Sequence, residues 1–387
     1  MQIALILILV NWLIKQVTFC NLNFLDRRFA NKYIDQVFAK NNFPDFRNVT
    51  LLDRTPEEVS NLLKASVVSD MTLDQRKQLS FSLDYMYLTC SFNDIPCNIN
   101  DDFVHTYDYN YGNCFTFNSG RFPNGSAAPI RKISEAGSDR SFRMDIFLGD
   151  DKFQNDFIPN SGARIVIHNQ SNTPIISSEG FDISTGYQTN IGIKRSFLYK
   201  LDAPYSTCIK ESDSADSHPS NYYKKMFTIL NMTNYRQENC LKLCLQDYIK
   251  FVCKCIDGSL SNIYGSTKVC ASIDDLKCVT QSRKDYYQNE DQEKCGEEKC
   301  PLECDSVSYQ LSTSNSRYPS LYYLRYLKAR TTINYRITLD NVSDAQENQV
   351  IKSTALLNVF YDDLSTTYIN EVPAITSDSL LGVIGGD

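Results

Sequence analysis

The chain has 387 residues, of which 42% are hydrophobic, so it can bury a large core without needing disulfides to compensate for small size. Its formal net charge is -7 at pH 7. Without a long basic run, this charge argues against nucleic acid as a partner, because nucleic acid rewards clustered Lys and Arg. We therefore expect cations or basic ligands as partners.

The chain contains 14 cysteines, densest between Cys240 and Cys304, and five Asn-X-Ser/Thr sequons. An even number of cysteines together with sequons is typical of a chain that folds in an oxidising compartment and faces the outside of the cell. The composition therefore argues against cytosolic function. The sequons predict glycosylation at Asn48, Asn124, Asn169, Asn231 and Asn341.

An apolar run occupies residues 3–14. As a helix it would span about 18 Å, against roughly 30 Å of bilayer hydrocarbon, so it does not cross a membrane unaided. Its length suits the core of a signal peptide, but no basic residue precedes it and no small-X-small cleavage site follows it. Residues 1–16 are therefore interpreted as an apolar leader or as the remnant of a membrane helix, with a buried segment as the third possibility.

The first predicted helix begins at Pro56. Residues 55–58, TPEE, form a capping box with proline at the first helical position, and apolar residues follow at helical spacing. Thr72 is placed to cap a second helix that leads toward Cys90. The apolar residues expected on one face of that second helix are Leu73, Leu79, Leu83 and Met86.

Strands and turns are predicted for residues 90–125. Short Tyr- and Phe-rich runs are broken there by Asn-Asp, Asn-Gly, Tyr-Gly and Ser-Gly pairs, which indicates a loop-rich β region. Residues 163–168 and 191–201 are β-branched or apolar and are bounded by turn residues. Both are therefore predicted strands.

The clearest later helix is predicted over residues 234–253, where Cys240 and Cys244 fall on one face. A Tyr/Leu-rich segment, residues 318–330, predicts a further short helix, and the alternation of residues 356–368 predicts a long strand. The most polar stretches are interpreted as solvated loops. These stretches are residues 210–220 and 282–299.

The motifs of common hydrolases are missing. The sequence has neither a Gly-X-Ser-X-Gly nucleophile elbow nor a His-Glu-X-X-His zinc helix, and no glycine-rich phosphate loop. The three histidines are dispersed and are interpreted as ordinary strand or loop residues. They are His105, His168 and His218. We therefore expect no enzyme, no catalytic residue and no cofactor.

The cysteines permit two chemical interpretations, metal ligation and disulfide bonding. Zinc knuckles favour paired Cys-X2-Cys units, which do not occur here, and the sequons place the chain where thiols oxidise. We therefore expect disulfides and no metal site. Spacing alone selects no pairing, because fourteen cysteines allow about 135,000 complete pairings.

Five segments in order along the chain resemble the degenerin/epithelial sodium channel family, which includes acid-sensing and peptide-gated channels. The most specific is residues 111–120, YGNCFTFNSG, which is similar to a signature of that family. Residues 17–23, VTFCNLN, resemble the strand that follows the first membrane helix of the family. The other similar segments are residues 203–208, APYSTC, residues 300–304, CPLEC, and residues 380–386, LLGVIGG.

The resemblance implies a complete set of disulfides with no cysteine left over. The implied pairs are Cys20–Cys114, Cys90–Cys97, Cys208–Cys304, Cys240–Cys300, Cys244–Cys295, Cys253–Cys278 and Cys255–Cys270.

The resemblance also implies an α+β fold in which a central β palm carries a helical finger and a disulfide-rich thumb. Residues 17–374 would form this ectodomain, with the thumb at about residues 205–305. The palm would include residues 17–22 and 356–368. A stiff thumb would transmit movement at a sensing surface toward the pore instead of dissipating it.

The sequence departs from the family at both ends. The first membrane helix is absent or reduced to residues 3–14, and residues 375–387 hold only the start of a truncated second membrane helix, before the selectivity filter. Ser379 matches a small-residue position at the outer pore mouth, and Tyr205 stands where acid-sensing members have a tryptophan. The resemblance implies gating or coupling roles for both, with a packed loop aromatic as the alternative for Tyr205.

The function implied is that of a subunit, incomplete as written, of a ligand- or proton-gated, amiloride-sensitive-type, sodium-selective channel. Its partners would be sodium ions, an extracellular ligand or protons, the membrane, and like subunits in a homo- or hetero-trimer, with no nucleic acid. Most of the chain would lie outside the plasma membrane. The alternative is a secreted, disulfide-rich binding module derived from a channel ectodomain.

Overall fold

The computed structural model describes residues 12–13, 16–43, 55–149, 158–170, 174–210, 215–216, 218–230, 232, 234–330 and 344–373. The chain folds into two compact units, and each is assembled from separate stretches of sequence. The first comprises residues 1–194 and 311–364, and the second comprises residues 195–310 and 365–387.

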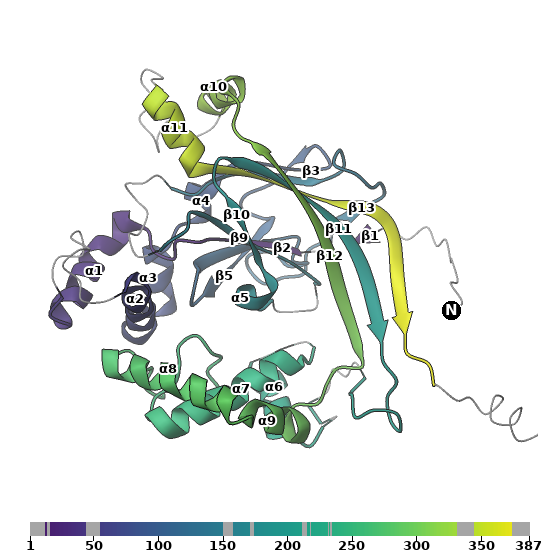
Figure 1. Cartoon of the computed structure of the whole chain (residues 1–387). Coiled ribbons are helices and arrows are strands. Elements are labelled where there is room, and N and C mark those ends of the chain that lie inside the picture. The colour runs from purple at the N-terminus through teal and green to yellow at the C-terminus, as the bar shows by residue number, and fades with distance from the viewer. Residues whose placement is uncertain are drawn as a thin grey trace, which may run out of the picture. The chain divides into compact units, whose positions relative to one another are not determined.

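The first unit contains a five-stranded antiparallel sheet in the order β10-β9-β2-β6-β5 (Figure 1). Every residue of the neighbouring strands β2 and β6 is buried, including the polar residues Thr18, Asn113 and Thr116, so both faces of these strands are covered. The strands are β2 (Gln16–Asn21), β5 (Phe103–Asp108), β6 (Gly112–Phe117), β9 (Gly162–His168) and β10 (Phe181–Ser184).

A second, six-stranded sheet has the order β12-β11-β13-β8-β3-β4. Three of its strands are long, and the boundary between the two units falls inside each of them: β11 (Tyr187–Tyr199), β12 (Asp305–Arg317) and β13 (Thr354–Asn370). In Figure 1 they are the teal, green and yellow strands that lie side by side. The other strands are β3 (Tyr87–Phe92), β4 (Ile95–Pro96) and β8 (Phe142–Phe147).

The two strands expected together in one palm, residues 17–22 and 356–368, lie in different sheets. Strand β2 belongs to the five-stranded sheet and β13 to the six-stranded sheet. Aromatic side chains pack between the sheets, and the rings of Phe117 on β6 and Phe142 on β8 stack with their centroids 4.3 Å apart. The mixed α+β class is as expected, but this part of the unit is a packed pair of sheets.

Helices of the first unit begin at the caps that the sequence carries. The predicted helix after Thr55 is α2 (Pro56–Asp70), and its capping box is complete, with the Thr55 and Glu58 side chains bonded to each other's backbone N–H groups. Helix α1 (Arg27–Lys40) was not predicted, although Asp26 caps it. Further helices of this unit are α5 (Ile176–Glu179), α10 (Leu321–Arg330), which lies where a helix was predicted, and α11 (Asp344–Ser353).

The single helix expected after Thr72 is two helices, α3 (Leu73–Leu79) and α4 (Leu83–Met86). The chain breaks between them because Ser80 donates a hydrogen bond from its hydroxyl to the carbonyl of Phe24, 2.8 Å away, and Ser82 starts a new helix as its N-cap. The face expected to be apolar is therefore not continuous, and Leu73 is exposed.

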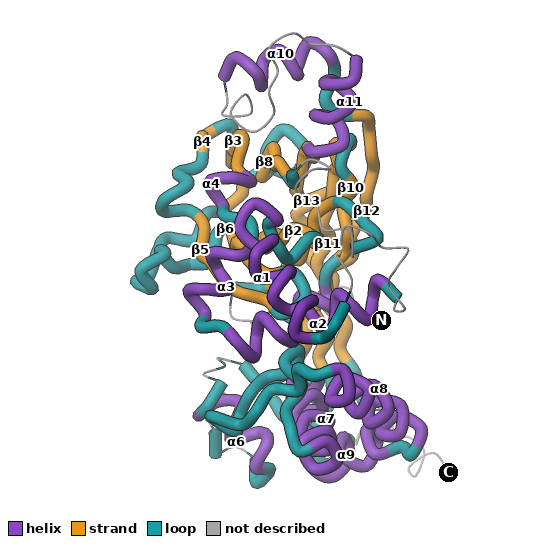
Figure 2. The backbone as a smooth tube through the Cα atoms, turned by 90° about the vertical axis from the view of Figure 1, so that its left-hand side faces the viewer, coloured by secondary structure: helices purple, strands orange, loops and turns teal. Residues whose placement is uncertain are grey.

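Among the described residues, the second unit contains four helices, which pack side by side in Figures 1 and 2. They are α6 (Asn221–Thr228), α7 (Gln237–Cys253), α8 (Ile273–Gln288) and α9 (Asp291–Lys299). The predicted helix over 234–253 is confirmed as α7. The predicted loop over 282–299 is wrong, because these residues form the end of α8 and all of α9.

The charged surface of α8 and α9 misled the sequence interpretation. Only a narrow side of α8 is buried, at Val279, Ser282 and Tyr286, so the apolar periodicity is weak. A capping box at Ser272 starts α8, and Cys278 and Cys295 fasten α8 and α9 to the rest of the unit. Tertiary cross-links thus stabilise helices that have little apolar surface.

The apolar run at residues 3–14 is described only in part. Trp12–Leu13 forms the short strand β1, which pairs with β7 (Lys132–Ile133). Most of residues 1–16, residues 211–214 and 217 of the loop 210–220, and all of 375–387 lie outside the described residues. Within the described ranges, no helix has the length and apolarity needed to cross a membrane.

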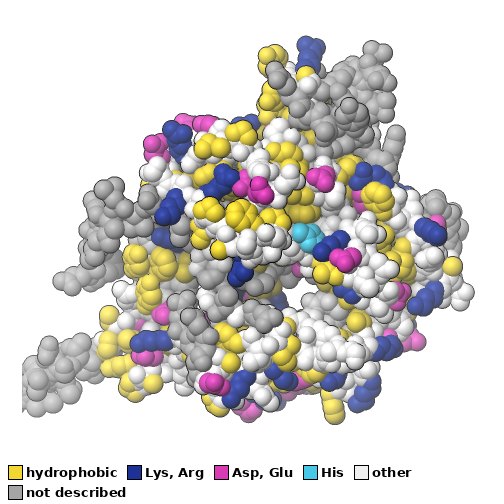
Figure 3. Space-filling model, turned by 180° about the vertical axis from the view of Figure 1, so that it is seen from behind, with side chains coloured by type: hydrophobic (Ala, Val, Ile, Leu, Met, Phe, Trp, Pro, Cys, Tyr) yellow, Lys and Arg dark blue, Asp and Glu magenta, His cyan; other side chains and the backbone are white. Residues whose placement is uncertain are grey.

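On the face shown in Figure 3, Lys and Arg side chains alternate with Asp and Glu side chains. The described atoms of this face therefore form no large area of one sign. A nucleic-acid-binding face would instead carry a basic stripe.

Candidate functional site

All 14 cysteines form disulfides, and five of these disulfides lie in the second unit. The seven pairs are the same as those that the resemblance implies. They are Cys20–Cys114, Cys90–Cys97, Cys208–Cys304, Cys240–Cys300, Cys244–Cys295, Cys253–Cys278 and Cys255–Cys270.

Three sulfurs come close enough together to resemble a metal site. The Sγ atoms of Cys244, Cys295 and Cys300 lie within 4.8 Å of one another. All three cysteines are oxidised, Cys300 to Cys240 and the other two to each other. A disulfide sulfur is not a thiolate, so this cluster joins α7 to α9 and the residue after it and offers no ligand set for zinc.

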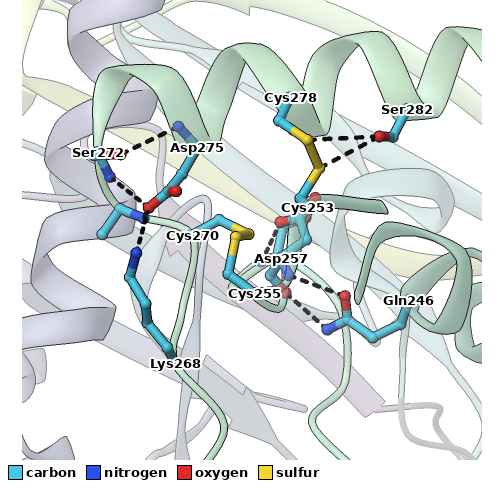
Figure 4. The surroundings of a disulfide bond; sticks show 12 residues. Gln246, Cys253, Cys255, Asp257, Lys268, Cys270, Ser272, Asp275, Cys278 and Ser282 are labelled. Carbon is cyan, nitrogen blue, oxygen red and sulfur yellow. Dashed lines mark hydrogen bonds and ion pairs between the residues drawn. A yellow bond between two sulfur atoms is a disulfide. The ribbon is translucent and has the colours of Figure 1, made fainter. Parts of the chain in front are cut away.

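Figure 4 shows how the Cys253–Cys278 and Cys255–Cys270 disulfides are set among hydrogen bonds. The Ser282 hydroxyl lies 3.3 Å from Cys253 Sγ and 3.9 Å from Cys278 Sγ. Nearby, Gln246 on α7 and the backbone of Asp257 exchange two hydrogen bonds of 2.9 Å. The side chain of Asp257 in turn pairs with Arg283 on α8 at 2.5 Å. The disulfides and the buried polar pair therefore fix α7 and α8 through the same short segment.

The start of α8 is held in the same way. The Ser272 capping box uses Asp275, whose carboxylate also pairs with Lys268 at 3.0 Å. These contacts with Lys268 and with Ser272 hold the pKa of Asp275 below its usual range, against the opposing effect of desolvation. Lys268 lies two residues before Cys270, so the ion pair orders the segment that carries the Cys255–Cys270 disulfide.

The segment that returns from α9 is tied to the segment that leaves β11. The Lys200 N–H donates to the Cys304 carbonyl and the Cys304 N–H donates to the Ile209 carbonyl, both at 2.8 Å. The Cys208–Cys304 disulfide lies beside these bonds. Both ends of the helical part of the second unit are therefore joined at one place.

Aromatic residues line the parts of β11 and β13 that belong to the second unit. The rings of Phe197, Tyr199 and Tyr368 are parallel within 9°, with centroids 5.3 to 6.3 Å apart. The Arg195 guanidinium lies 4.8 Å from the Phe197 centroid and donates to the Thr366 hydroxyl at 3.3 Å. This stack joins the two strands across their ladder.

This stack was not predicted, although part of its pattern is readable in the sequence. Phe197 and Tyr199 alternate within a predicted strand, and Tyr368 closes the other predicted strand. Alternate aromatic residues share one face of a strand. Their pairing depended on strand order, which the sequence did not reveal.

Tyr205 lies in the turn 203–205, where its N–H donates to the Asp202 carbonyl at 2.9 Å. Its side chain is 61% exposed. The ring is therefore not packed within the described chain, and a coupling role for it stays a prediction.

Two of the five sequons can be located. Asn124 is exposed, and its Oδ1 accepts hydrogen bonds from the N–H and hydroxyl of Ser126. Asn169 is half-buried directly after β9. Ser379, Asn48, Asn231 and Asn341 lie outside the described residues.

The three histidines lie on different elements of the chain. His105 on β5 bonds Asn113 at 2.8 Å, and burial lowers its pKa. His168 on β9 bonds the buried Thr18 hydroxyl at 2.8 Å. Burial also lowers the pKa of His218, which lies in the second unit. These contacts place His105 and His168 among the side chains of the five-stranded sheet, where the Thr18 hydroxyl is fully buried.

A model of the family described as "Amiloride-sensitive sodium channel" matches residues 14–387. The chain is 26% identical to the epithelial sodium channel subunit gamma of Rattus norvegicus over 325 residues, which cover 83% of this chain and 46% of the relative. It is 25% identical to degenerin mec-4 of Caenorhabditis briggsae over 353 residues, covering 89% of this chain and 41% of that protein. It is 26% identical to degenerin mec-10 of Caenorhabditis elegans over 342 residues, which cover 85% of this chain and 42% of that protein.

The chain thus spans less than half the length of these curated relatives. The family match includes both large sheets and helices α6 to α9. The matched family is one of membrane channels and not of enzymes, which confirms the expectation that the chain is not an enzyme. The family resemblance of the sequence is confirmed as well, and the chain belongs to the amiloride-sensitive sodium channel family.

Proposed function

We propose that this chain forms the extracellular part of one subunit of a ligand- or proton-gated, sodium-selective channel at the plasma membrane. The observation that carries the proposal is the family match over residues 14–387. Sodium ions, an extracellular ligand or protons, the membrane, and like subunits in a homo- or hetero-trimer are the proposed partners.

In this proposal, helices α6 to α9 correspond to the thumb at about residues 205–305, and helices α1 to α3 correspond to the finger. The long strands β11, β12 and β13 correspond to the palm. The assignment of the thumb is supported by its five disulfides. Each can contribute about 2 to 4 kcal/mol by restricting the unfolded chain, so together they disfavour local opening of this unit.

Stiffness of the thumb matters for the proposed coupling. A stimulus shifts the equilibrium between the open and closed states of a gate only if it stabilises one of the two states more than the other. Local opening of the helices would absorb displacement before it reached the strands. The exposed Tyr205 lies in the short segment between β11 and Cys208, where displacement of the helices would enter the strand. We propose Tyr205 as a coupling residue there, and Ser379 as a residue of the outer pore mouth.

The proposal is tested on the full-length transcript. Sequencing past the codon for Asp387 should reveal a selectivity filter and a further apolar stretch of about 20 residues. Expression of that full-length protein in oocytes should give a current that is carried by sodium, is blocked by amiloride and is opened by protons or a ligand. Replacing external sodium with an impermeant cation should abolish the inward current.

A stop codon directly after Asp387, together with release of soluble glycoprotein into the medium, would instead support the secreted binding module.

A matched pair of variants tests the coupling role of Tyr205. Tyr205→Ala should change the stimulus dependence of the current, whereas Tyr322→Ala, at an exposed tyrosine of α10, should not.

A further inference from the structure

Three lysines of the second unit surround two tyrosines, Tyr222 on α6 and Tyr264. The Lys250 Nζ lies 3.8 Å from the centroid of the Tyr264 ring. The Lys225 Nζ lies 5.7 Å from the same centroid and 5.9 Å from that of Tyr222, and the Lys299 Nζ lies 5.8 Å from that of Tyr222. We refer to Lys225, Lys250 and Lys299 as the lysine cluster.

The carboxylate in contact with these rings belongs to Asp247, and its oxygens accept hydrogen bonds. Both tyrosine hydroxyls donate hydrogen bonds to Asp247, one to each oxygen. Burial and the contact with Asp247 raise the pKa of Tyr222, so the phenol stays neutral and keeps donating. Asp247 therefore orients the two rings, and among the described residues it forms no ion pair with the lysine cluster.

Other lysines on the same helices are neutralised. On α6, Lys224 pairs with Asp216 at 3.8 Å. On α7, Lys242 pairs with Glu238 at 3.2 Å, and on α9, Lys294 pairs with Asp291 at 3.4 Å. Each of the three helices thus carries one lysine with a carboxylate partner and one lysine of the cluster.

The lysine cluster has no such partner within the described part of the chain. Its members lie on α6, at the end of α7 and at the end of α9, and these three helices pack against one another (Figure 2). The ring contacts gather the three ammonium groups around the same two tyrosines, which raises the local positive potential, and the aromatic faces offset the repulsion only in part. In a chain of net charge -7, such a concentration of unpaired positive charge favours an anion.

We propose that the lysine cluster binds a multiply charged oxyanion, sulfate or phosphate, either free or as an ester group on a larger molecule. Each ammonium offers several N–H donors, and an oxyanion presents several acceptor oxygens that three ammonium groups can share. A monovalent halide has neither the charge nor the separate acceptors to engage all three.

The test is calorimetric titration of the whole chain with sodium sulfate and with sodium chloride at matched, low ionic strength, since salt screens such contacts. Sulfate should bind saturably and chloride should not. Each of Lys225→Gln, Lys250→Gln and Lys299→Gln should weaken sulfate binding by about three- to tenfold, the range expected for one exposed charge-assisted hydrogen bond.

Matched controls come from the same helices. Lys224→Gln, Lys242→Gln and Lys294→Gln remove the same charge but should change sulfate affinity less than about twofold, because these ammonium groups already have carboxylate partners. Equal losses in the two sets would show non-specific charge attraction and overturn the proposal. Equal affinity for sulfate and chloride would overturn it too. Circular dichroism of every variant verifies that the fold is retained.

A second titration identifies the source of the anion. A sulfated oligosaccharide that binds at least about tenfold more tightly than inorganic sulfate, and loses affinity in the Lys225, Lys250 and Lys299 variants, would assign the site to an ester group on a larger molecule. Binding of the oligosaccharide no tighter than sulfate, with the same dependence on the three lysines, would assign it to a free ion.

Discussion

Asp145 on β8 is fully buried and accepts hydrogen bonds from three hydroxyl groups. Thr89 on β3 donates one, and Tyr318 and Tyr323 donate the others at 2.7 Å and 3.1 Å. Burial and the contact with Asp145 raise the pKa of Tyr323 to about 12, so the phenol remains a donor at neutral pH. The carboxylate thus holds the start of α10 against the six-stranded sheet.

Removing one donor should be costly. Tyr318→Phe leaves a buried carboxylate with one hydrogen bond fewer, and we expect the free energy of unfolding to fall by about 1 to 3 kcal/mol. Urea denaturation followed by circular dichroism measures the change. Tyr322→Phe is the matched control, because Tyr322 is 83% exposed on α10, just beyond Tyr318, and should change stability little. Equal stability of the two variants would contradict the role given to Asp145.

No pattern in the sequence predicts this hydrogen-bond network around Asp145. Asp145 and Tyr318 are 173 residues apart and meet only because the chain folds β8 and the start of α10 together. Local patterns report what a residue does to its neighbours in sequence. A buried polar network of distant residues leaves no such pattern.

At the scale of elements, Gly192 lets three strands be joined across the sheet. The Asp362 side chain on β13 passes over Gly192 on β11 and accepts a hydrogen bond of 2.6 Å from Ser312 on β12. A Cβ on residue 192 would occupy the position of the Asp362 carboxylate. Glycine is needed at position 192 because the Asp362 side chain must cross β11 to reach Ser312 on β12.

A double-mutant cycle tests this arrangement. Gly192→Ala should displace the carboxylate and lower stability by about 1 to 2 kcal/mol, the cost of a lost hydrogen bond with some repacking. The same change in an Asp362→Ala background should cost close to nothing, since the space is then empty. Chemical denaturation of the four proteins gives the coupling energy, and additive effects would refute the account.

The disulfides differ in the length of chain that they close. Cys240–Cys300 spans a sequence separation of 60, whereas Cys90–Cys97 spans 7. The chain-entropy model gives about 4 kcal/mol for the first and about 2 kcal/mol for the second. We therefore expect Cys240→Ala/Cys300→Ala to lower the urea midpoint more than Cys90→Ala/Cys97→Ala. The reverse order would show that structure remaining in the unfolded chain governs their effect.

Most elements with a strong local signal were predicted, but α1 and α8 were missed although they begin at Asp26 and at the Ser272 capping box. The capping box at Thr55 and the apolar alternation of β13 are readable in a short window, and both elements are present. Helices α8 and α9 have polar sequences and are held by Cys278 and Cys295, so apart from the α8 capping box the contacts that fix them involve residues distant in sequence. Strand order likewise set β2 and β13 in separate sheets.

At the scale of the whole molecule, buried tyrosines make stability depend on alkaline pH. Burial raises the pKa of Tyr107, Tyr286 and Tyr323 from 10.0 to about 12. As the pH passes about 10, the unfolded chain releases these phenol protons while the folded chain keeps them. The unfolded state then binds fewer protons, so the free energy of unfolding must fall as the pH rises from about 10 to about 12.

Tyrosinate absorbance provides the measurement. In the folded chain a fraction of the 24 tyrosines should ionise at higher pH than in the guanidinium-unfolded chain. The unfolding midpoint, followed by circular dichroism, should decline over the same interval. A folded chain whose tyrosines all titrate together with those of the unfolded chain would contradict the burial of these phenols.

The Cys208–Cys304 disulfide has a further consequence for the molecule as a whole. It joins the two ends of the segment that holds α6 to α9, so residues 208–304 form a covalently closed loop. A protease that cuts once anywhere inside this loop cannot release either fragment, because the bond still links the pieces. Such a cut would be invisible on a non-reducing gel and would appear only after reduction. Processing within this segment could therefore alter the protein while every part of it stays attached.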